Sequence, residues 1–216
     1  MCRCKICHTK TRAIIDDKKE LTYYRCLSCG FIYLDDKYMV DSQREKAQYE
    51  NHQNSFDSLG YVKMFEDFID KAITPYEESI ESALEFGCGT GPVLAELLSR
   101  RGMSVDKYDI YFYPQKVYEG KCYDLITSTE VFEHLQNPME ILELLTNHTN
   151  EGGYIILMTK FPPNDDREFV NWWYRRDVTH ISFFTPKSFE VMAKKVGLEV
   201  IGTIDENIVV FRRSYL

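Results

Sequence analysis

The fold of this chain is indicated by one stretch of its sequence, Ser82-Ala-Leu-Glu-Phe-Gly-Cys-Gly-Thr-Gly-Pro92. Its apolar residues up to Phe86 predict a strand, and glycines at positions 87, 89 and 91 predict a tight turn directly after it. Pro92 suits the first position of a helix, and Gly102 suits the position just beyond its end. A strand, a glycine turn and a helix form the first nucleotide-binding unit of a doubly wound α/β sheet.

The spacing of the glycines indicates which nucleotide is bound. A dinucleotide fingerprint has glycines at its first, third and sixth positions. Counting from Gly87, the glycines of this turn stand at the first, third and fifth positions, and Pro92 occupies the sixth. The pattern, with Glu85 two residues before it, favours a close backbone approach to an adenosyl amino acid that carries no phosphate.

The segment Glu85–Gly91 resembles the first motif of class I S-adenosylmethionine-dependent methyltransferases, and further motifs follow in the family's order over roughly residues 61–216. The resemblance implies a Rossmann-like methyltransferase sheet, with S-adenosyl-L-methionine as the methyl donor. The cofactor-binding residues that it implies are Glu85, Phe86, Gly87, Cys88, Gly89, Gly91, Asp109, Ile110, Thr129 and Glu130.

Asp109 ends the predicted second strand, 22 residues after Gly87. A carboxylate at this place can accept hydrogen bonds from both ribose hydroxyls of a bound nucleotide, although an acid at a strand end can also be a helix cap or a loop residue. Only 13 residues separate Asp109 from Tyr123, so the usual third-strand unit is shortened. We therefore expect an apolar wall from Ile110, Tyr111 or Phe112 to contact the adenine.

The apolar and turn residues predict the remaining elements of this domain. They are a helix over 61–72 that Pro75 ends, a central strand after Cys122, a helix capped by Asn137 and Pro138, a strand Tyr154–Met158 that Gly152-Gly153 precedes, a helix from Thr185-Pro186 to Gly197, and a hairpin of 198–204 and 208–212.

Glu130, Glu133 and His134 follow the central strand, where ligands of open α/β sheets bind. The string resembles that of quinone-biosynthesis O-methyltransferases, in which these positions can hold a divalent cation near a catechol-like acceptor. The interpretation that we favour gives Glu130 a contact with the cofactor or the backbone and makes His134 a packed helix residue. Glu130 and His134 remain candidates for catalysis.

The segment 169–184 contains both tryptophans of the chain. It lies where a loop commonly covers the acceptor pocket in this fold. His180 is the leading candidate for a general base, and a structural histidine is the alternative. Substrate binding is assigned to Trp172, Trp173, Arg175 and Arg176, with an arginine holding an anionic acceptor.

The N-terminal cysteines form two pairs, Cys4 with Cys7 and Cys26 with Cys29, and 18 residues separate the pairs. This is the spacing of a four-thiolate zinc ribbon, in which a hairpin of TRAIIDD and LTYYRC returns the second pair to the first. Four protein ligands make such a zinc structural, not catalytic. Disulfides are the alternative, disfavoured in a reducing compartment. Cys88 and Cys122 are predicted to be small core residues.

The 216 residues carry a net charge of −8, divided into +4 for residues 1–30 and −12 for the remainder. Three units are expected: a zinc ribbon at 1–34, a linker or lid at 35–60, and a methyltransferase domain at 61–216. In the linker, Tyr49, His52 and Asn54, followed by Tyr61, resemble an entry segment of small ribbon-bearing bacterial methyltransferases that could close over the cofactor, although the favoured interpretation is a polar linker that is only solvated. No apolar run is long enough to span a membrane and no secretory signal is evident, so a cytoplasmic protein is expected.

The favoured function is methyl transfer to an oxygen or carbon nucleophile of a small-molecule acceptor. An RNA methyltransferase that docks RNA on the basic ribbon is the first alternative, but no basic stripe interleaved with aromatic residues is present. A non-catalytic binding protein that retains the fold is the second. The sequence does not indicate the oligomeric state.

Overall fold

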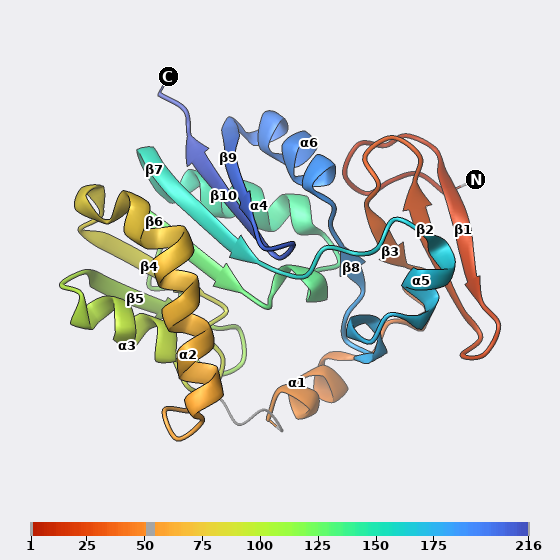
Figure 1. Cartoon of the computed structure of the whole chain (residues 1–216), viewed down its shortest axis with the longest axis horizontal. Coiled ribbons are helices and arrows are strands. Elements are labelled where there is room, and N and C mark those ends of the chain that lie inside the picture. Colours follow the sequence, from red (N-terminus) through yellow and green to blue (C-terminus); the bar gives the residue numbers. More distant parts are fainter. Residues whose placement is uncertain (1, 51–54, 216) are drawn as a thin grey trace.

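A six-stranded mixed sheet forms the centre of the molecule in the computed structural model, which describes residues 2–50 and 55–215 (Figure 1). The strand order is β5-β4-β6-β7-β10-β9. β4, β5, β6 and β7 run parallel, whereas β10 is antiparallel to both β7 and β9. The strands are β4 (Ser82–Phe86), β5 (Ser104–Tyr108), β6 (Tyr123–Thr129), β7 (Thr149–Met158), β9 (Leu198–Ile204) and β10 (Ile208–Arg213).

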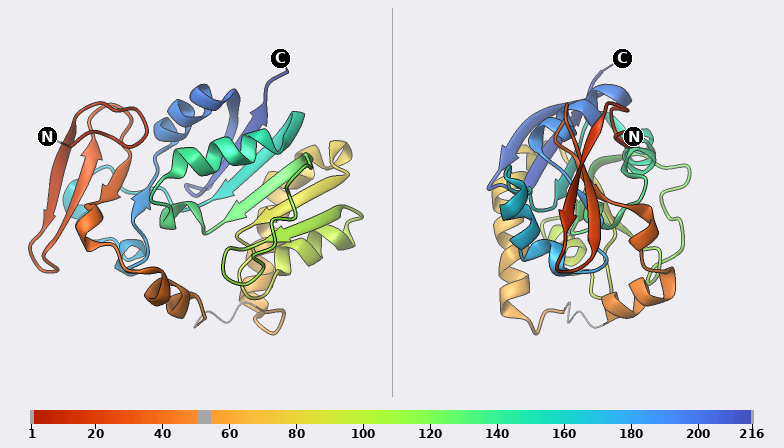
Figure 2. Two further views of the ribbon diagram at one scale, coloured as in Figure 1. Left: turned by 180° about the vertical axis from the view of Figure 1, so that it is seen from behind. Right: turned by 90° about the vertical axis from the view of Figure 1, so that its right-hand side faces the viewer.

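Helices cover both faces of this sheet, as the doubly wound prediction requires (Figures 1 and 2). Along β7, alternate side chains enter different cores: Ile156 packs with α2 and α3, and Ile155 packs with α4 and α6. This period of two arises because successive strand residues point to opposite faces. The helices are α2 (Leu59–Phe68), α3 (Val93–Arg100), α4 (Pro138–Asn147) and α6 (Pro186–Val196).

The third-strand unit is shortened, as predicted. Residues 110–122 contain turns and an isolated bridge in place of a helix and a strand. As a result β5 is the edge strand of the sheet, and the segment after Asp109 is left to line the ligand side.

The N-terminal ribbon consists of β1 (Thr11–Asp16), β2 (Leu21–Cys26) and β3 (Ile32–Leu34). A fourth strand, β8 (Ser182–Phe183), comes from the distant loop between β7 and α6 and pairs with β3. The ribbon sheet therefore includes chain from outside residues 1–34. It is also bound to α6, because Thr185 Oγ1 donates to the carbonyl of Cys29 (2.7 Å) and Lys195 Nζ donates to that of Ile6 (2.7 Å).

Four expectations for individual elements need correction. The helix over 61–72 is not ended by Pro75, because a π-helical turn Ile69–Ile73 and a 3-10 helix Thr74–Ser79 continue it. Pro75 lies in the first turn of the 3-10 helix, where its missing N–H is harmless.

The other three corrections concern a strand, a helix cap and a cysteine. Gly152-Gly153 lies inside β7, which begins at Thr149. Asn137 occupies the N-cap of α4, but its side chain makes no capping hydrogen bond. Cys122 is exposed and is not a core residue.

The described part of the expected linker, residues 35–60, includes a short 3-10 helix (Asp36–Tyr38) and the helix α1 (Ser42–Glu50), and neither has a buried residue. His52 and Asn54 lie outside the described residues, whereas Tyr49 is described and faces the pocket discussed below. Among the described residues, no helix is both long and apolar enough to cross a membrane.

Candidate functional site

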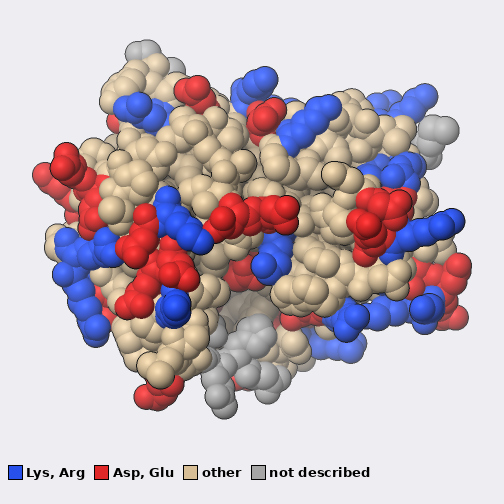
Figure 3. Space-filling model, in the orientation of Figure 1, with Lys and Arg blue, Asp and Glu red and all other residues tan. Residues whose placement is uncertain are grey.

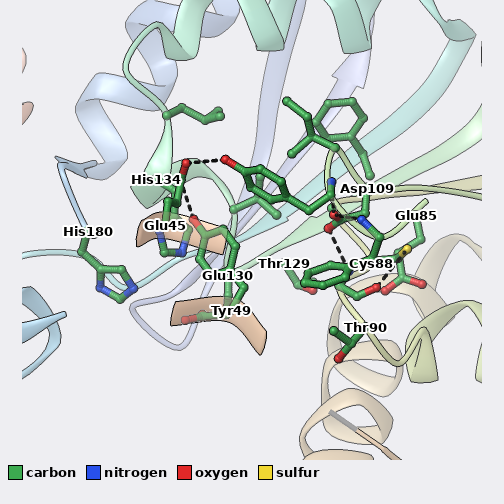
Figure 4. A pocket seen from close by; sticks show the side chains of 18 of the residues that line it. Glu45, Tyr49, Glu85, Cys88, Thr90, Asp109, Thr129, Glu130, His134 and His180 are labelled. Atoms are coloured by element: carbon green, nitrogen blue, oxygen red, sulfur yellow. Dashed lines mark hydrogen bonds between the residues drawn. The ribbon is translucent and has the colours of Figure 1, made fainter. Parts of the chain in front are cut away.

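A cavity of about 640 Å³ opens at the carboxyl ends of β4, β5 and β6. Figure 4 shows Glu85, Cys88 and Asp109 at one end, His134, His180, Glu45 and Tyr49 at the other, and Thr129 and Glu130 between them. We call the first the glycine-turn end and the second the histidine end. The pocket side chains come from strand ends and the segments that follow them, from α1 and α2, and from the loop that carries β8.

The glycine turn has a backbone conformation that residues other than glycine rarely adopt. Gly87 has φ of 84°, and a Cβ at this position would lie 2.2 Å from Cγ2 of Val131. Gly89 has φ of 65°, again in the left-handed region. The amides of Gly87 (2.7 Å) and Cys88 (3.2 Å) both donate to the carbonyl of Tyr108, which holds the turn against β5.

Asp109 is buried directly after β5 and fastens the turn. Its Oδ2 accepts from the amide of Gly89 (3.0 Å), and its Oδ1 accepts from the amides of Tyr111 (2.8 Å) and Phe112 (3.0 Å). A carboxylate has about four acceptor sites, so Oδ2 retains capacity for a further donor. The residue predicted to bind ribose therefore organises the backbone of the glycine turn and of the segment that follows β5.

The side chain of Glu85 lies beneath the start of α3. Its Oε2 accepts from the amide of Ala95 (2.9 Å), an otherwise unsatisfied donor of the first helical turn. Burial raises the pKa of Glu85 to about 8, against the opposing effect of that hydrogen bond. The predicted apolar wall is also present, because Ile110, Tyr111 and Phe112 all line the cavity.

Two glutamates and a tyrosine meet at the wall of the pocket, where Glu130 and Tyr174 line the cavity and Glu133 is fully buried. The hydroxyl of Tyr174 lies 3.0 Å from Oε2 of Glu130 and 2.5 Å from Oε1 of Glu133. Burial, followed by repulsion from Glu133, raises the pKa of Glu130, and burial raises that of Glu133. One hydroxyl has a single proton, so Tyr174 can donate to only one of the two carboxyl groups. No sequence signal singled out Tyr174, whose position depends on the loop conformation.

Glu130 has strained backbone in addition to its buried carboxyl. Its φ is 54°, which is uncommon for a residue other than glycine, asparagine or aspartate. Its amide donates to the carbonyl of Met158 (2.8 Å) and so ties the end of β6 to β7. Strain of this kind persists where the surrounding structure holds it and is concentrated at functional sites.

His134 and His180 lie side by side, with ring centroids 4.7 Å apart. Nδ1 of His134 lies 3.1 Å from the carbonyl of Thr179, and Nδ1 of His180 lies 2.7 Å from that of Tyr174. Because a carbonyl only accepts, each Nδ1 carries a proton, and the two backbone carbonyls fix the orientation of the rings.

The structure separates the four residues predicted to bind substrate. Trp173 lines the pocket and is 58% exposed, whereas Trp172 packs against the aromatic core beneath the ribbon. Arg175 is buried away from the pocket, where it forms an ion pair with Asp16 of the ribbon. Arg176 is not among the pocket-lining residues. Neither arginine is placed to hold an anionic acceptor, because one is engaged by Asp16 and the other lies outside the cavity.

The thiols of Cys4, Cys7, Cys26 and Cys29 come together at the end of the ribbon, all within 4.8 Å of one another. The Cys7–Cys26 and Cys4–Cys29 sulfur distances are 3.3 and 3.7 Å, and all seven cysteines are free. Tetrahedral zinc with bonds of about 2.3 Å sets its sulfurs ~3.8 Å apart. Backbone amides of Ile6 and Ser28 point at two of the sulfurs (both 3.4 Å). The thiol set fits a structural zinc and not a disulfide pair.

A second group of potential metal ligands consists of Glu133, His134 and His180. It differs from the set considered from the sequence, since His180 takes the place of Glu130. Oε1 of Glu133 is engaged by Tyr174 and its Oε2 is buried without a partner in the described structure. The set could bind a divalent ion chemically, but the hydrogen bonds that hold both imidazoles already account for its geometry.

Comparison with known proteins agrees with this architecture. The magnesium protoporphyrin IX methyltransferase of Synechocystis PCC 6803 with bound SAM matches at TM-score 0.53 and 15% identity, over 82% of this chain and 94% of that one. The mitomycin 7-O-methyltransferase MmcR matches at a TM-score of 0.58 and 14% identity, over 81% of this chain and 58% of that one. Human N-acetylserotonin methyltransferase matches at a TM-score of 0.52 and 13% identity, over 72% of this chain and 55% of that one.

These identities indicate a shared fold, and this chain spans just over half of the mitomycin and human enzymes. No curated protein sequence matches the chain. A family model described as a methyltransferase domain matches residues 49–203, well over half of the 216 residues. With its glycine turn and doubly wound sheet, this chain belongs to that family and is a methyltransferase.

Proposed function

We propose that the protein transfers a methyl group from S-adenosyl-L-methionine to an oxygen or carbon nucleophile of a small molecule. The observation that carries the proposal is one cavity with two chemically different ends. The glycine-turn end has a close-approach backbone and a ribose-type carboxylate. The histidine end has two imidazoles, and Glu130 lies between the two ends.

The donor binds at the glycine-turn end in this proposal. The turn from Glu85 to Gly91 lies beneath its amino-acid part, Asp109 accepts from a ribose hydroxyl through Oδ2, and Ile110 with its neighbours contacts the adenine. Thr129 and Glu130, at the end of β6, lie between the two ends and close to the transferred methyl group. S-adenosylmethionine supplies an electrophilic methyl carbon, so the chain chiefly aligns the acceptor and excludes water.

His180 acts as the general base at the acceptor end. Its Nδ1–H donates to the carbonyl of Tyr174, which orients the ring, and in this proposal Nε2 takes the proton of the acceptor as the new bond forms. His134, held in the same way by Thr179, is the second imidazole within reach. Glu130 contributes a hydrogen-bonding carboxyl that Tyr174 orients. Trp173 forms part of the acceptor wall.

Zinc at the four cysteines would have a structural role. All four positions of a tetrahedral ion would be filled by thiolates, so no open position remains for chemistry. Free thiols in this number fit a reducing compartment, as expected of a cytoplasmic protein.

The three neighbours support a small-molecule acceptor, since their names refer to a magnesium protoporphyrin, a mitomycin and N-acetylserotonin. RNA docking lacks comparable support. Lysine and arginine side chains are interspersed with acidic ones over the face shown in Figure 3, with no continuous basic area on that face.

Calorimetric titration with S-adenosylmethionine and with its demethylated product tests the donor site. Asp109→Asn should weaken binding by about tenfold or more, because the amide presents a donor where an acceptor is needed. An unchanged affinity would remove Asp109 from the site, and no binding by the wild-type protein would favour the non-catalytic alternative.

Transfer of a labelled methyl group to a metabolite extract, compared with transfer to total RNA, tests the acceptor class. Once an acceptor is found, His180→Gln should lower kcat by about a hundredfold or more. Labelled RNA without labelled small molecules would support the docking alternative instead.

A further inference from the structure

We propose that the folded ribbon orders the histidine end of the pocket, so that loss of metal from the four cysteines loosens residues 159–185 and leaves the glycine-turn end intact. Tyr174 and His180 lie in these residues, which we call the β7–α6 segment because they join β7 to α6. The assignment of the histidine end to the acceptor rests on the proposed function, whereas the contacts between the segment and the ribbon do not depend on it.

The β7–α6 segment has little regular structure of its own. It contains the helix α5 (Asp166–Asn171), a 3-10 helix at Tyr174–Arg176 and the two-residue strand β8. Connections of more than about 15 residues with so little structure are uncommon in compact domains. Figure 1 shows α5 beside the strands of the ribbon. The conformation of the segment is therefore set largely by what packs against it.

Backbone hydrogen bonds join the ribbon to the residue that follows His180. The amide of Leu34 in β3 donates to the carbonyl of Ile181 (2.8 Å), and the strand pairing continues into β8. On the other side, the amide of Ile181 donates to the carbonyl of Glu133 (2.8 Å). β8 is therefore held between the ribbon and the chain that follows β6, and unfolding of the ribbon would remove one of these two supports.

Two arginine ion pairs cross the same interface in opposite directions. Arg175 of the segment forms a buried ion pair with Asp16 of β1. Arg25 of β2 pairs with Asp166 of α5 (Nε–Oδ1 2.9 Å), and its Nη2 donates to the carbonyl of Pro163 (3.0 Å). A buried charge that loses its partner is strongly destabilising, so both pairs favour this conformation of the segment only while the ribbon is folded.

The apolar core of the segment is shared with the ribbon. Tyr23 of β2 packs edge-on against the rings of Phe169 (5.2 Å) and Phe183 (6.2 Å). The described members of this core come from residues 14–39 and 169–183, and none of them belongs to the six-stranded sheet or to the helices that cover it. Without the folded ribbon, the aromatic rings of the segment would lose the surface that shields them from water.

The ribbon is too small to fold firmly on its own core. Units of this size usually need a metal or disulfides to be stable, and small metal-bound units commonly unfold when the metal is removed. The cysteine cluster also contacts the far end of the β7–α6 segment, because Thr185 Oγ1 donates to the carbonyl of Cys29 (2.7 Å). Loss of metal would therefore reach Tyr174 and His180 through β8, the two ion pairs and the shared core.

The glycine-turn end has a separate set of supports. The amide of Gly87 donates to the carbonyl of Tyr108, and the amide of Gly89 donates to Oδ2 of Asp109. Both acceptors lie at the end of β5, and neither hydrogen bond involves the ribbon. Binding at this end should survive the loss of metal, which makes it an internal reference for the histidine end.

Hydrogen exchange measured by mass spectrometry on the zinc-loaded full chain, before and after treatment with a zinc chelator, tests the proposal. We expect peptides over residues 163–184 to exchange at least about tenfold faster after chelation, and peptides over 82–100 to keep their rates. The affinity for S-adenosylhomocysteine, the demethylated donor, should stay within about twofold. Adding zinc back should restore the protection.

Three results would overturn the proposal: a purified chain that binds no zinc, unchanged protection of 163–184 in a chain that has lost its zinc, or an equal loss of protection over 82–100. A fall in the affinity for S-adenosylhomocysteine on chelation would also contradict it. If the zinc-loaded chain does not bind S-adenosylhomocysteine at all, the proposed function fails, and the exchange rates still decide whether the ribbon orders the segment.

Asp166→Asn is a second test that leaves the cysteines untouched. It removes the partner of Arg25, so peptides over 163–176 should exchange about threefold faster or more, with unchanged zinc content and unchanged affinity for S-adenosylhomocysteine. Glu168→Gln makes the same change in charge at an exposed residue in the first turn of α5 and should leave the exchange rates as they are. Equal effects of the two substitutions, or no effect of Asp166→Asn, would contradict the role of the ion pair.

Discussion

Arg175 forms a buried ion pair with Asp16, and this pair joins the loop that carries His180 to the zinc ribbon. The guanidinium also donates to the hydroxyl of Tyr23 (3.2 Å) and to the carbonyl of Phe169 (3.0 Å). A few residues further on, β8 continues the ribbon sheet. The ribbon is therefore part of the support for the histidine end of the pocket.

Asp16→Asn should lower the free energy of unfolding by about 3–5 kcal/mol, because it leaves the buried Arg175 without a counter-charge. Burial raises the pKa of Asp16, but Arg175 outweighs that effect and lowers it overall. The contribution is therefore present near neutrality and is lost as the pH falls below about 4. Urea unfolding at several pH values measures it. Asp17→Asn, at the exposed neighbouring position, is the control and should change little.

Cys26→Ser should abolish binding of one zinc ion per chain and loosen the ribbon, because the thiolate set would lose one of its four ligands. Trp172 packs against a cluster that includes ribbon residues Tyr23 and Ile32, so its fluorescence should shift to longer wavelength. Metal analysis and emission spectra check both effects. Cys122→Ser changes an exposed thiol outside the cluster and should leave the zinc content intact. Equal zinc in both variants would refute the ribbon assignment.

Gly87→Ala should abolish donor binding and destabilise the protein by about 1–3 kcal/mol, because the new Cβ would lie 2.2 Å from Val131 on a left-handed backbone. Thermal unfolding and calorimetry with S-adenosylmethionine measure the two effects. Adding Val131→Ala should relieve the clash and recover part of the stability. Gly60→Ala, with open space around it in α2, is the control and should be neutral or slightly stabilising.

Glu85→Gln should remove a pH dependence of stability. Burial raises the folded pKa of Glu85 to about 8, so between its ordinary value and pH 8 the folded protein holds a proton that the unfolded chain has lost. The free energy of unfolding of the wild type should therefore fall as pH rises through this window, by at most roughly 5 kcal/mol. Glutamine stays neutral and can still accept from Ala95. Urea unfolding from pH 5 to 8, in the absence of donor, should give a flatter profile for the variant; parallel profiles would contradict the buried-acid assignment.

Local patterns predicted the parts of the fold that depend on neighbouring residues. The glycine turn, the two cysteine pairs and the end of β5 at Asp109 were recognisable because backbone conformation and ligand spacing are set within a few residues. The extent of β7 and the continuation beyond Pro75 were misjudged, since strand pairing and helix packing there override the local signals of glycine and proline.

The sequence by itself determined a methyltransferase fold with a four-cysteine ribbon, because those features are short-range and chemically specific. Contacts between distant parts of the folded chain decide that Arg175 pairs with Asp16 of the ribbon and does not line the pocket, and that Tyr174 bridges Glu130 and Glu133. The physical reason is distance along the chain: Asp16 and Arg175 are 159 residues apart, and no local pattern states which buried charge will find which partner.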